Sequence, residues 1–375
     1  MINFVSNLPR DLRSGGFSAL GAGALTAVEA LDRVNYVGAI PLRSDFDQKL
    51  MSKLLRVSGL PGAFHQYSAR RLTANARAVE RQCRPEAALD VFHGFTPWSM
   101  THPPRAYIAW SDCTFRDYLQ IYHRRSEFSV SDIARIEAAE ADWLSRARRV
   151  AFTSRWAADN AIRDYRLAPD RVDVVGIFGE VEPPAHDVYE GGQMFAFVST
   201  NFAAKGGAVV LEAFGRVRAA HPEASLVIVG DCPKDPDEEP GVTVAGFLRK
   251  EDPDESRRFR DILGHARAVV HPTRSDIAPH ILVEAALFGC PVIASRRFAI
   301  PEIVDNGRTG LLLDDPADTA EVARAMAWML EHPDYPAMRK AAWIEGRERH
   351  TRSRFEDRLR ATVRAALAER NQATS

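Results

Sequence analysis

Two acidic side chains near the start of one predicted helix are the clearest candidates for ligand binding or catalysis in this chain of 375 residues. Asp276 lies in a loop after a buried strand, and Glu284 follows eight residues later, inside a helix predicted to open at Pro279. The free backbone N–H groups of such a helix start can bind phosphate, and carboxylates beside them can accept hydrogen bonds from sugar hydroxyls. On pattern alone, Asp276 as a helix N-cap residue and Glu284 as a solvated helix residue explain the spacing equally well.

A lysine–glycine turn is the second candidate contact for a phosphate. Lys205-Gly206-Gly207 lies between the predicted strand Phe195–Ser199 and the predicted helix Ala208–Ala220. Glycine lets the backbone approach a ligand closely, and a lysine at a strand-to-helix junction is well placed to neutralise a diphosphate leaving group. A solvated lysine beside an ordinary turn is the alternative.

Two strand ends in the N-terminal half carry further candidates. Gly15-Gly16 follows the predicted strand Ile2–Ser6, where glycine permits a tight turn with exposed backbone N–H groups. His93 follows the predicted strand Leu89–Phe92, although a lone histidine in such a place is more often structural.

Short apolar runs alternate with amphipathic helical segments along the whole chain, which predicts βαβ units and parallel sheets. The expected strands are Ile2–Ser6, Tyr36–Ile40, Leu89–Phe92, Ala106–Trp110, Val150–Thr153, Val172–Val175, Phe195–Ser199, Ser225–Val229, Val242–Ala245, Ala268–His271, Val292–Ala294 and Leu311–Leu313. A stretch with two prolines and two glycines, Glu180–Gly192, breaks the alternation and predicts a linker. We therefore expect an α/β protein with two doubly wound, Rossmann-like domains facing across a cleft: residues 1–182, a linker 183–192, residues 193–350, and a C-terminal helix and tail 351–375.

The composition excludes several other classes. A net charge of −1 gives no field that would attract nucleic acid, and four scattered cysteines without a Cys-x-x-Cys pair fit a reducing cytosol. No apolar run approaches the ~20 residues that span a bilayer, and the first residues do not form a signal peptide. We expect a cytoplasmic protein. The arginine-rich stretch 70–84 leaves open a peripheral contact with the inner face of the membrane, although a solvated helix face is the simpler interpretation.

The segment Phe195–Pro333, about a third of the chain, closely resembles family 4 retaining glycosyltransferases of the GT-B fold. The lysine–glycine turn, followed by LEAFGRVRAAHPEASLVIVGD, is similar to the opening of that family's donor-binding domain. Asp276 to Glu284 resembles its Glu-x7-Glu motif, and VEAALFGCPVIAS and IPEIVDNGRTGLLLDDP continue in the family's order. The N-terminal half is similar only loosely, through Gly15-Gly16, FHGFTP and IAWSDCTF.

This resemblance implies transfer of a sugar from a nucleotide-diphosphate sugar to a glycan or lipid-linked acceptor, with retention at the anomeric carbon and without a metal or other cofactor. It places such an enzyme in the synthesis of a bacterial-type polysaccharide or glycoconjugate. It implies that Asp276 holds a sugar hydroxyl and favours the cationic transition state, while Glu284 binds the ribose. The further donor contacts that it implies are Gly16, Lys205, Ala278, His280 and Ile281. His93 is a candidate on the acceptor side.

The chain also departs from the family pattern. Asp276 stands where the family has glutamate, and Thr200 stands where it often has arginine. Many relatives place a histidine facing the donor sugar at a strand end where this chain offers Asp112, which we predict to be catalytic or to orient the acceptor, with a loop or N-cap aspartate as the alternative. These departures leave open a non-catalytic GT-B protein that binds a nucleotide or glycan. A nucleotide-sugar epimerase or dehydrogenase is disfavoured because no Gly-x-Gly-x-x-Gly follows the first strand.

Overall fold

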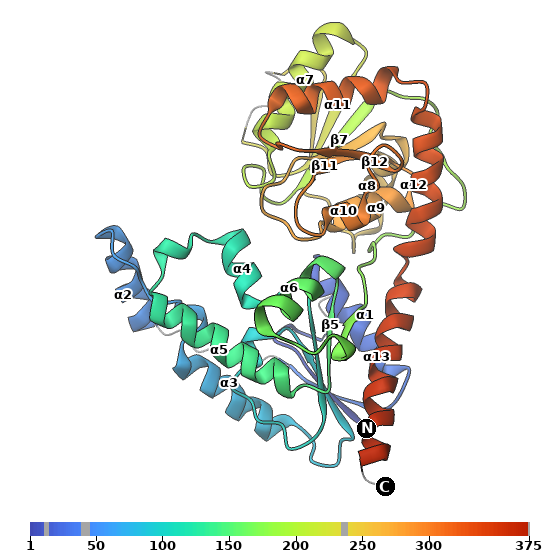
Figure 1. Cartoon of the computed structure of the whole chain (residues 1–375). Helices are drawn as coiled ribbons and strands as arrows, with labels where there is room; N and C mark the ends of the chain where they lie inside the picture. Colours follow the sequence, from blue (N-terminus) through green and yellow to red (C-terminus); the bar gives the residue numbers. More distant parts are fainter. Residues whose placement is uncertain (11–14, 39–45, 234–238, 374–375) are drawn as a thin grey trace. The chain divides into compact units, whose positions relative to one another are not determined.

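The computed structural model describes residues 1–10, 15–38, 46–233 and 239–373. The chain divides into two compact units: the first is Met1–Gly176 with Phe355–Ser375, and the second is Ile177–Arg354. Each unit contains one six-stranded sheet, and the paired strands run parallel (Figure 1). The predicted α/β class with two Rossmann-like domains is confirmed.

The first unit has the strand order β2-β1-β3-β4-β5-β6. Its strands are β1 (Ile2–Val5), β2 (Val34–Val37), β3 (Leu89–His93), β4 (Tyr107–Ser111), β5 (Arg149–Phe152) and β6 (Val172–Val174). Its helices are α1 (Phe17–Glu29), α2 (Phe46–Val57), α3 (Ala69–Gln82), α4 (Phe115–Tyr122), α5 (Val130–Arg146), α6 (Arg155–Tyr165) and, at the C-terminus, α13 (Arg352–Ala373).

The second unit has the strand order β12-β11-β10-β7-β8-β9. Its strands are β7 (Met194–Ser199), β8 (Ser225–Gly230), β9 (Val242–Gly246), β10 (Ala268–His271), β11 (Val292–Ser295) and β12 (Gly310–Leu313). Its helices are α7 (Gly207–Ala220), α8 (Pro253–His265), α9 (His280–Leu287), α10 (Ile300–Ile303), α11 (Thr319–Glu331) and α12 (Tyr335–Arg349). The chain winds away from β7 in one direction and away from β10 in the other. The carboxyl ends of these two neighbours form a topological switch point, where open α/β sheets bind ligands.

Helices cover both faces of the sheet in the second unit, which explains why its central strands are largely apolar. All residues of β10 and β11 are buried. Helix α7 packs with α11, and α9 packs with α12 (Figure 1). The core under α7 and α11 joins Phe195 and Phe197 of β7 to Phe214 and Met326. This packing holds the carboxyl ends of β7 and β10 in fixed positions.

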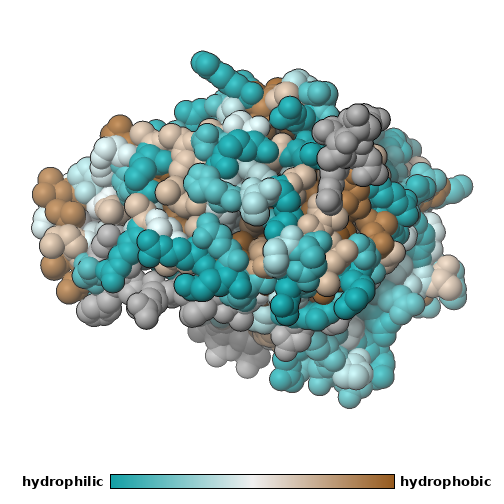
Figure 2. All heavy atoms as spheres, turned by 90° about the horizontal axis from the view of Figure 1, so that it is seen from below, coloured by the Kyte–Doolittle hydropathy of each residue, from teal (hydrophilic) through white to brown (hydrophobic). Residues whose placement is uncertain are grey.

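Helix α2 of the first unit has an apolar outer face. Five of the nine exposed large hydrophobic side chains among the described residues lie on this helix or directly after it: Leu50, Met51, Leu54, Val57 and Leu60. Figure 2 shows hydrophobic spheres at the left end of the view, where α2 lies in Figure 1.

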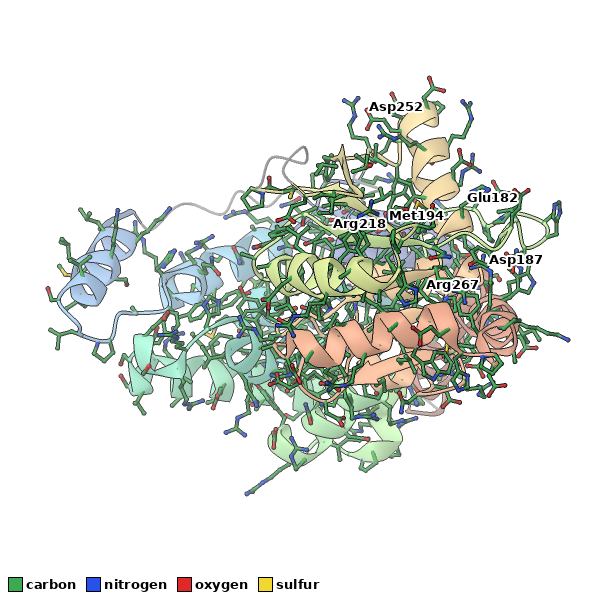
Figure 3. All side chains as sticks on the ribbon, turned by 90° about the horizontal axis from the view of Figure 1, so that it is seen from above. Glu182, Asp187, Met194, Arg218, Asp252 and Arg267 are labelled. Carbon is green, nitrogen blue, oxygen red and sulfur yellow. The ribbon has the colours of Figure 1, made fainter. Side chains whose placement is uncertain are left out.

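Residues 183–192, which we predicted to be a linker, instead pack on the second unit. Asp187 accepts two hydrogen bonds from the buried Arg339 guanidinium, at 2.7 and 2.8 Å. The Tyr189 ring lies 4.1 Å from that guanidinium, and its hydroxyl accepts a hydrogen bond from Arg267 at 2.9 Å. Figure 3 shows Asp187 and Arg267 on the same side of the unit. The proline and glycine content predicts a linker. It does not reveal that one aspartate and one tyrosine anchor this segment to the second unit.

The C-terminal helix α13 packs on the first unit from Phe355 onward, rather than forming a separate tail. Arg149 of β5 forms an ion pair with Glu369 at 3.1 Å. The Phe355 ring lies 5.9 Å from the ring of Trp110 in β4. The first unit is therefore built from both ends of the chain.

Strand β2 begins earlier than predicted, at Val34 rather than Tyr36. Asn35 is accommodated inside the strand because its amide donates a hydrogen bond to Asn3 Oδ1 of β1, at 2.8 Å. Residues 39–40, which the prediction included, lie outside the described residues. The other predicted strands agree with the observed ones to within one residue at each end.

Candidate functional site

Lys205 and Asp276 meet at the switch point of the second unit. Lys205 follows β7 and precedes α7, and Asp276 lies in the loop between β10 and α9. The Lys205 Nζ donates to Asp276 Oδ2 at 2.5 Å and to the Ser275 carbonyl at 2.9 Å. The side chains are 20% and 23% exposed, so a ligand with phosphate or hydroxyl groups can reach both.

The turn that carries Lys205 depends on glycine. Gly206 has a φ of 83° and is the N-cap residue of α7. A Cβ at this position would lie 2.7 Å from the carbonyl oxygen of Pro272, directly after β10. The absence of a side chain therefore lets this turn lie against the start of the loop that carries Asp276.

Glu284 is buried in a second ion pair of the same unit. It is 1% exposed, and its Oε1 accepts from Lys250 Nζ at 2.6 Å and from the backbone N–H of Glu180 at 3.1 Å. Burial alone would lower the pKa of Lys250, but the charges of Glu284 and Glu180 outweigh it, so the pKa of Lys250 is raised. The alternative of a solvated helix residue is wrong for Glu284. Neither Lys250 nor Glu180 belongs to a recognisable motif, so neither could be identified from the sequence.

The start of α9 lies one residue later than predicted. His280 is its first residue, and Pro279 is the N-cap residue rather than part of the first turn. Ala278 is half-buried just before the helix, while Ile281 is buried inside it. The predicted donor contacts at this helix start therefore share one loop-to-helix junction.

His280 connects the two ion pairs electrostatically. Burial is the main reason that its pKa is lowered, and the charges of Glu284, Lys250 and Asp276 also act on it. Asp276 lies just before α9 and Glu284 in its second turn, so both ion pairs involve residues near the start of this helix.

His271 is a further buried side chain at this site. It ends β10 and is 2% exposed, and among the described residues neither ring nitrogen has a hydrogen-bond partner. Burial lowers its pKa to about 4, so the ring is neutral at pH 7. The sequence analysis used this residue only to mark the end of a strand.

In the first unit, His93 ends β3 at the edge where β1 also ends. Its Nδ1 lies 3.1 Å from Ser6 Oγ, and its ring stacks on Trp110 with the centroids 4.4 Å apart. It is 1% exposed, and burial lowers its pKa to about 3. His93 is therefore a neutral, packed histidine.

Asp112 directly follows β4, which pairs with β3, so it lies at the same sheet edge as His93. It is half-buried, and burial raises its pKa. Ser111 Oγ donates to its Oδ1 at 3.2 Å. Asp112 does not cap α4, because Thr114 is the N-cap residue there, so the N-cap alternative is wrong.

Gly16 is the N-cap residue of α1, with a φ of 45°. Gly15 before it also has a positive φ. The predicted tight turn is therefore present, and among the described residues no side chain caps the start of α1.

Glu140 is a buried carboxylate that the sequence analysis missed. It lies in α5 and accepts hydrogen bonds from the Thr96 hydroxyl at 2.5 Å and from the backbone N–H of Phe115 at 2.6 Å. Phe115 is the first residue of α4, so Glu140 anchors the start of the helix that follows Asp112. Burial raises the pKa of Glu140 to about 7.

Glu140→Gln is expected to change how stability depends on pH. The pKa of about 7 in the folded chain lies above the ordinary value of 4.5, so the folded chain holds this proton more tightly than the unfolded chain. The resulting stabilisation is complete below pH 4.5 and is lost as the pH rises to about 7. Across that window, the unfolding free energy of the wild type should fall by about 3 kcal/mol relative to the glutamine variant. Urea unfolding at pH values on both sides of the window measures this difference, and parallel curves for the two proteins would contradict it.

The described residues show neither a metal-binding cluster, nor a helix able to cross a bilayer, nor a disulfide. No group of three or more His, Cys, Asp or Glu side chains there is arranged to hold a metal ion. No described helix combines the length and apolarity that crossing a bilayer requires. The four cysteines are not in disulfides.

Comparisons with known proteins place part of the chain in a family context. Residues 192–332 match the family model of glycosyl transferases group 1. The chain is 25% identical over 191 residues to the phosphatidylinositol N-acetylglucosaminyltransferase gpi3 subunit of Schizosaccharomyces pombe, which covers 47% of this chain and 41% of that protein. The chain thus spans less than half the length of that relative.

Solved structures share the fold over nearly the whole chain. Sucrose-phosphate synthase from Thermosynechococcus elongatus is 15% identical with a TM-score of 0.71, covering 98% of this chain and 99% of its own. HepE from Anabaena, solved with UDP and glucose, is 16% identical with a TM-score of 0.65, covering 97% of this chain and 99% of its own. These likenesses confirm the expected GT-B fold. The family match relates residues 192–332 to glycosyl transferases group 1.

Proposed function

We propose that this chain is a retaining glycosyltransferase of family 4 that moves a sugar from a nucleotide-diphosphate sugar to a glycan or lipid-linked acceptor. The observation that carries this proposal is the pairing of Lys205 with Asp276 at the switch point of the second unit. The pair lies inside the segment that matches glycosyl transferases group 1. We assign the donor to residues 193–350 and the acceptor to residues 1–182.

The polar groups predicted to bind the donor have distinct roles in this proposal. Lys205 and the backbone N–H groups at the start of α9 hold the diphosphate, and Glu284 accepts hydrogen bonds from the ribose hydroxyls. Asp276 accepts a hydrogen bond from a hydroxyl of the transferred sugar and stabilises positive charge near the anomeric carbon. Its present bond to Lys205 keeps the ammonium aimed at the same place.

The reaction breaks the bond between the anomeric carbon and the donor phosphate oxygen. The acceptor oxygen forms the new bond on the same face of the sugar, and its proton passes to the leaving phosphate. The main energetic problem is negative charge on that phosphate, which a fixed cation and helix dipoles stabilise. We therefore propose that Lys205 does this without a metal ion.

The first unit supplies the acceptor side in this proposal. Asp112 lies at the end of β4 with a raised pKa, so it can accept or share a proton with an acceptor hydroxyl. His93 is neutral and packed against Trp110, which favours a role in shaping the acceptor site. Gly16 contributes free backbone N–H groups at the start of α1.

A non-catalytic protein that binds a nucleotide or glycan is the second candidate. The observation that favours it is the buried ion pair between Glu284 and Lys250, because an ion pair with a purely structural role would have the same geometry. Asp276 and Thr200, which depart from the family pattern, point the same way.

A panel of nucleotides separates these candidates. We expect the nucleotide that matches the donor, among UDP, GDP and ADP, to raise the melting temperature by about 5–10 °C at a hundred times its Kd. The corresponding nucleotide sugar should then be converted slowly to nucleoside diphosphate, and faster with the right acceptor. UDP is the first to test because HepE was solved with it. A shift without any turnover across a broad acceptor screen would favour the binding protein. No shift with any nucleotide would contradict the glycosyltransferase and the nucleotide-binding protein, and would leave only glycan binding.

A further inference from the structure

The outer face of α2 combines apolar side chains in helical register. Leu50, Met51, Leu54 and Val57 follow the spacing i, i+1, i+4, i+7, which places them on one face of the helix. They are 47–81% exposed, and Leu60 continues the face after the helix ends. Single exposed hydrophobic residues need no explanation, but a contiguous stripe of this kind marks an interaction surface.

The opposite side of α2 fixes this orientation. Ser52 is 1% exposed, and its hydroxyl donates to the carbonyl of Ala63 at 3.0 Å. Leu55, on the same side, is half-buried. The helix therefore packs on its own unit through one side and presents the apolar stripe on the other.

Positive charge lies along one border of the stripe. Lys49 and Lys53 are exposed and one turn apart, next to Leu50 and Leu54. At the N-terminal end of the same face, Asp47 is within 3.9 Å of Arg70, which offsets its charge. An apolar face bordered by lysines is the pattern of a helix that lies in the surface of an anionic bilayer.

We propose that the face of α2 formed by Leu50, Met51, Leu54 and Val57 inserts into the surface of an anionic lipid bilayer, with Lys49 and Lys53 at the headgroups. A second copy of the chain fits this surface less well. A two-fold contact would have to use this same patch on both partners. Four side chains of one helix fall short of the ~800 Å² that each partner of a stable dimer buries.

This surface differs from the arginine-rich stretch singled out in the sequence. Arg77 and Arg81 of α3 are exposed, but the apolar residues of that helix, such as Leu72 and Val79, are buried. Helix α3 thus offers charge without an insertable face. Substitutions in α2 and in α3 can therefore distinguish their contributions to membrane binding.

The test is co-sedimentation of the full chain with vesicles of phosphatidylcholine alone and of phosphatidylcholine mixed with phosphatidylglycerol in equal parts. We expect binding to the mixed vesicles. Met51→Ser with Leu54→Ser should weaken it by about tenfold or more, because two inserted side chains are lost. Lys49→Gln with Lys53→Gln should weaken it by about tenfold or more as well, and should flatten its dependence on salt.

Two matched controls keep the outcomes distinct. Arg77→Gln with Arg81→Gln removes equal charge from α3, and Ile344→Ser removes a 43% exposed hydrophobic side chain from α12; both should bind as the wild type does. All substituted side chains are exposed, and circular dichroism melting checks that each variant is folded. The proposal is overturned if the wild type ignores mixed vesicles, if the α3 variant loses as much binding as the Lys49/Lys53 variant, or if a dimer in solution becomes monomeric in the Met51/Leu54 variant. Nucleotide turnover without vesicle binding would overturn this proposal and leave the proposed function standing.

Discussion

Lys205→Ala is expected to lower kcat for sugar transfer by about 10²–10³-fold, the cost typical of removing one donor that stabilises transition-state charge. The reason is the position of its ammonium, which the Ser275 carbonyl and Asp276 hold at the switch point. That ammonium is the only lysine nitrogen bonded to the β10–α9 loop among the described residues. Release of nucleoside diphosphate at saturating donor measures the effect.

Two comparisons separate catalysis from folding in this experiment. Lys205→Arg keeps the charge and should recover part of kcat, although its planar group is less well suited to the same point contact. Lys340→Ala removes an exposed lysine of α12 and should leave kcat unchanged. If Lys205→Ala melts like the wild type and turns over at the same rate, the assignment of this lysine to the diphosphate is wrong.

The contact between Lys205 and Asp276 could be anticipated only in part. Each residue follows a strand that the apolar pattern predicts correctly, and both strands end at the same edge of a parallel sheet. The pattern does not say that β7 and β10 are neighbours, because strand order depends on long-range packing. The family resemblance supplied that link, and the hydrogen bond is consistent with it.

The surroundings of Glu284 could not be predicted from the sequence. Its partner Lys250 lies in the loop after β9, and Glu180 lies in the segment interpreted as the start of a linker. Both contacts join residues far apart in the chain. Nothing in the local sequence distinguishes Lys250 from a solvated loop lysine, so only the folded structure reveals the pair.

The burial of Glu140, in contrast, could have been predicted from the pattern of its helix. In α5, Ile133, Ile136, Trp143 and Leu144 are buried, and Glu140 falls on the same face at helical spacing. A carboxylate on an apolar stripe needs a hydrogen-bond partner inside the protein. The pattern therefore could have identified a buried acid, but not Thr96 and Phe115 as its donors, since both lie on other elements.

Glu284→Gln is expected to raise KM for the donor by about 10–100-fold while changing kcat little, because each hydrogen bond to a charged group contributes about 1.5–3 kcal/mol. The ribose is remote from the reacting bond, so its contacts are the same in the ground and transition states and affect binding alone. Steady-state kinetics at varied donor concentration measures both constants. This split distinguishes Glu284 from Lys205, whose loss should act on kcat.

The ion pair between Glu284 and Lys250 allows a specific test of whether Glu284 binds the ribose. Among the described residues, Glu284→Gln leaves the largely buried Lys250 with Glu180, at 3.5 Å, as its one remaining acidic partner, so the variant should lose about 1–3 kcal/mol of unfolding free energy. Adding Lys250→Gln removes the unpaired charge and should restore much of that stability. If Glu284 binds the ribose, the double variant regains its melting temperature but keeps the raised KM. If Glu284 serves only to pair with Lys250, KM returns to the wild-type value together with stability, and the ribose assignment fails.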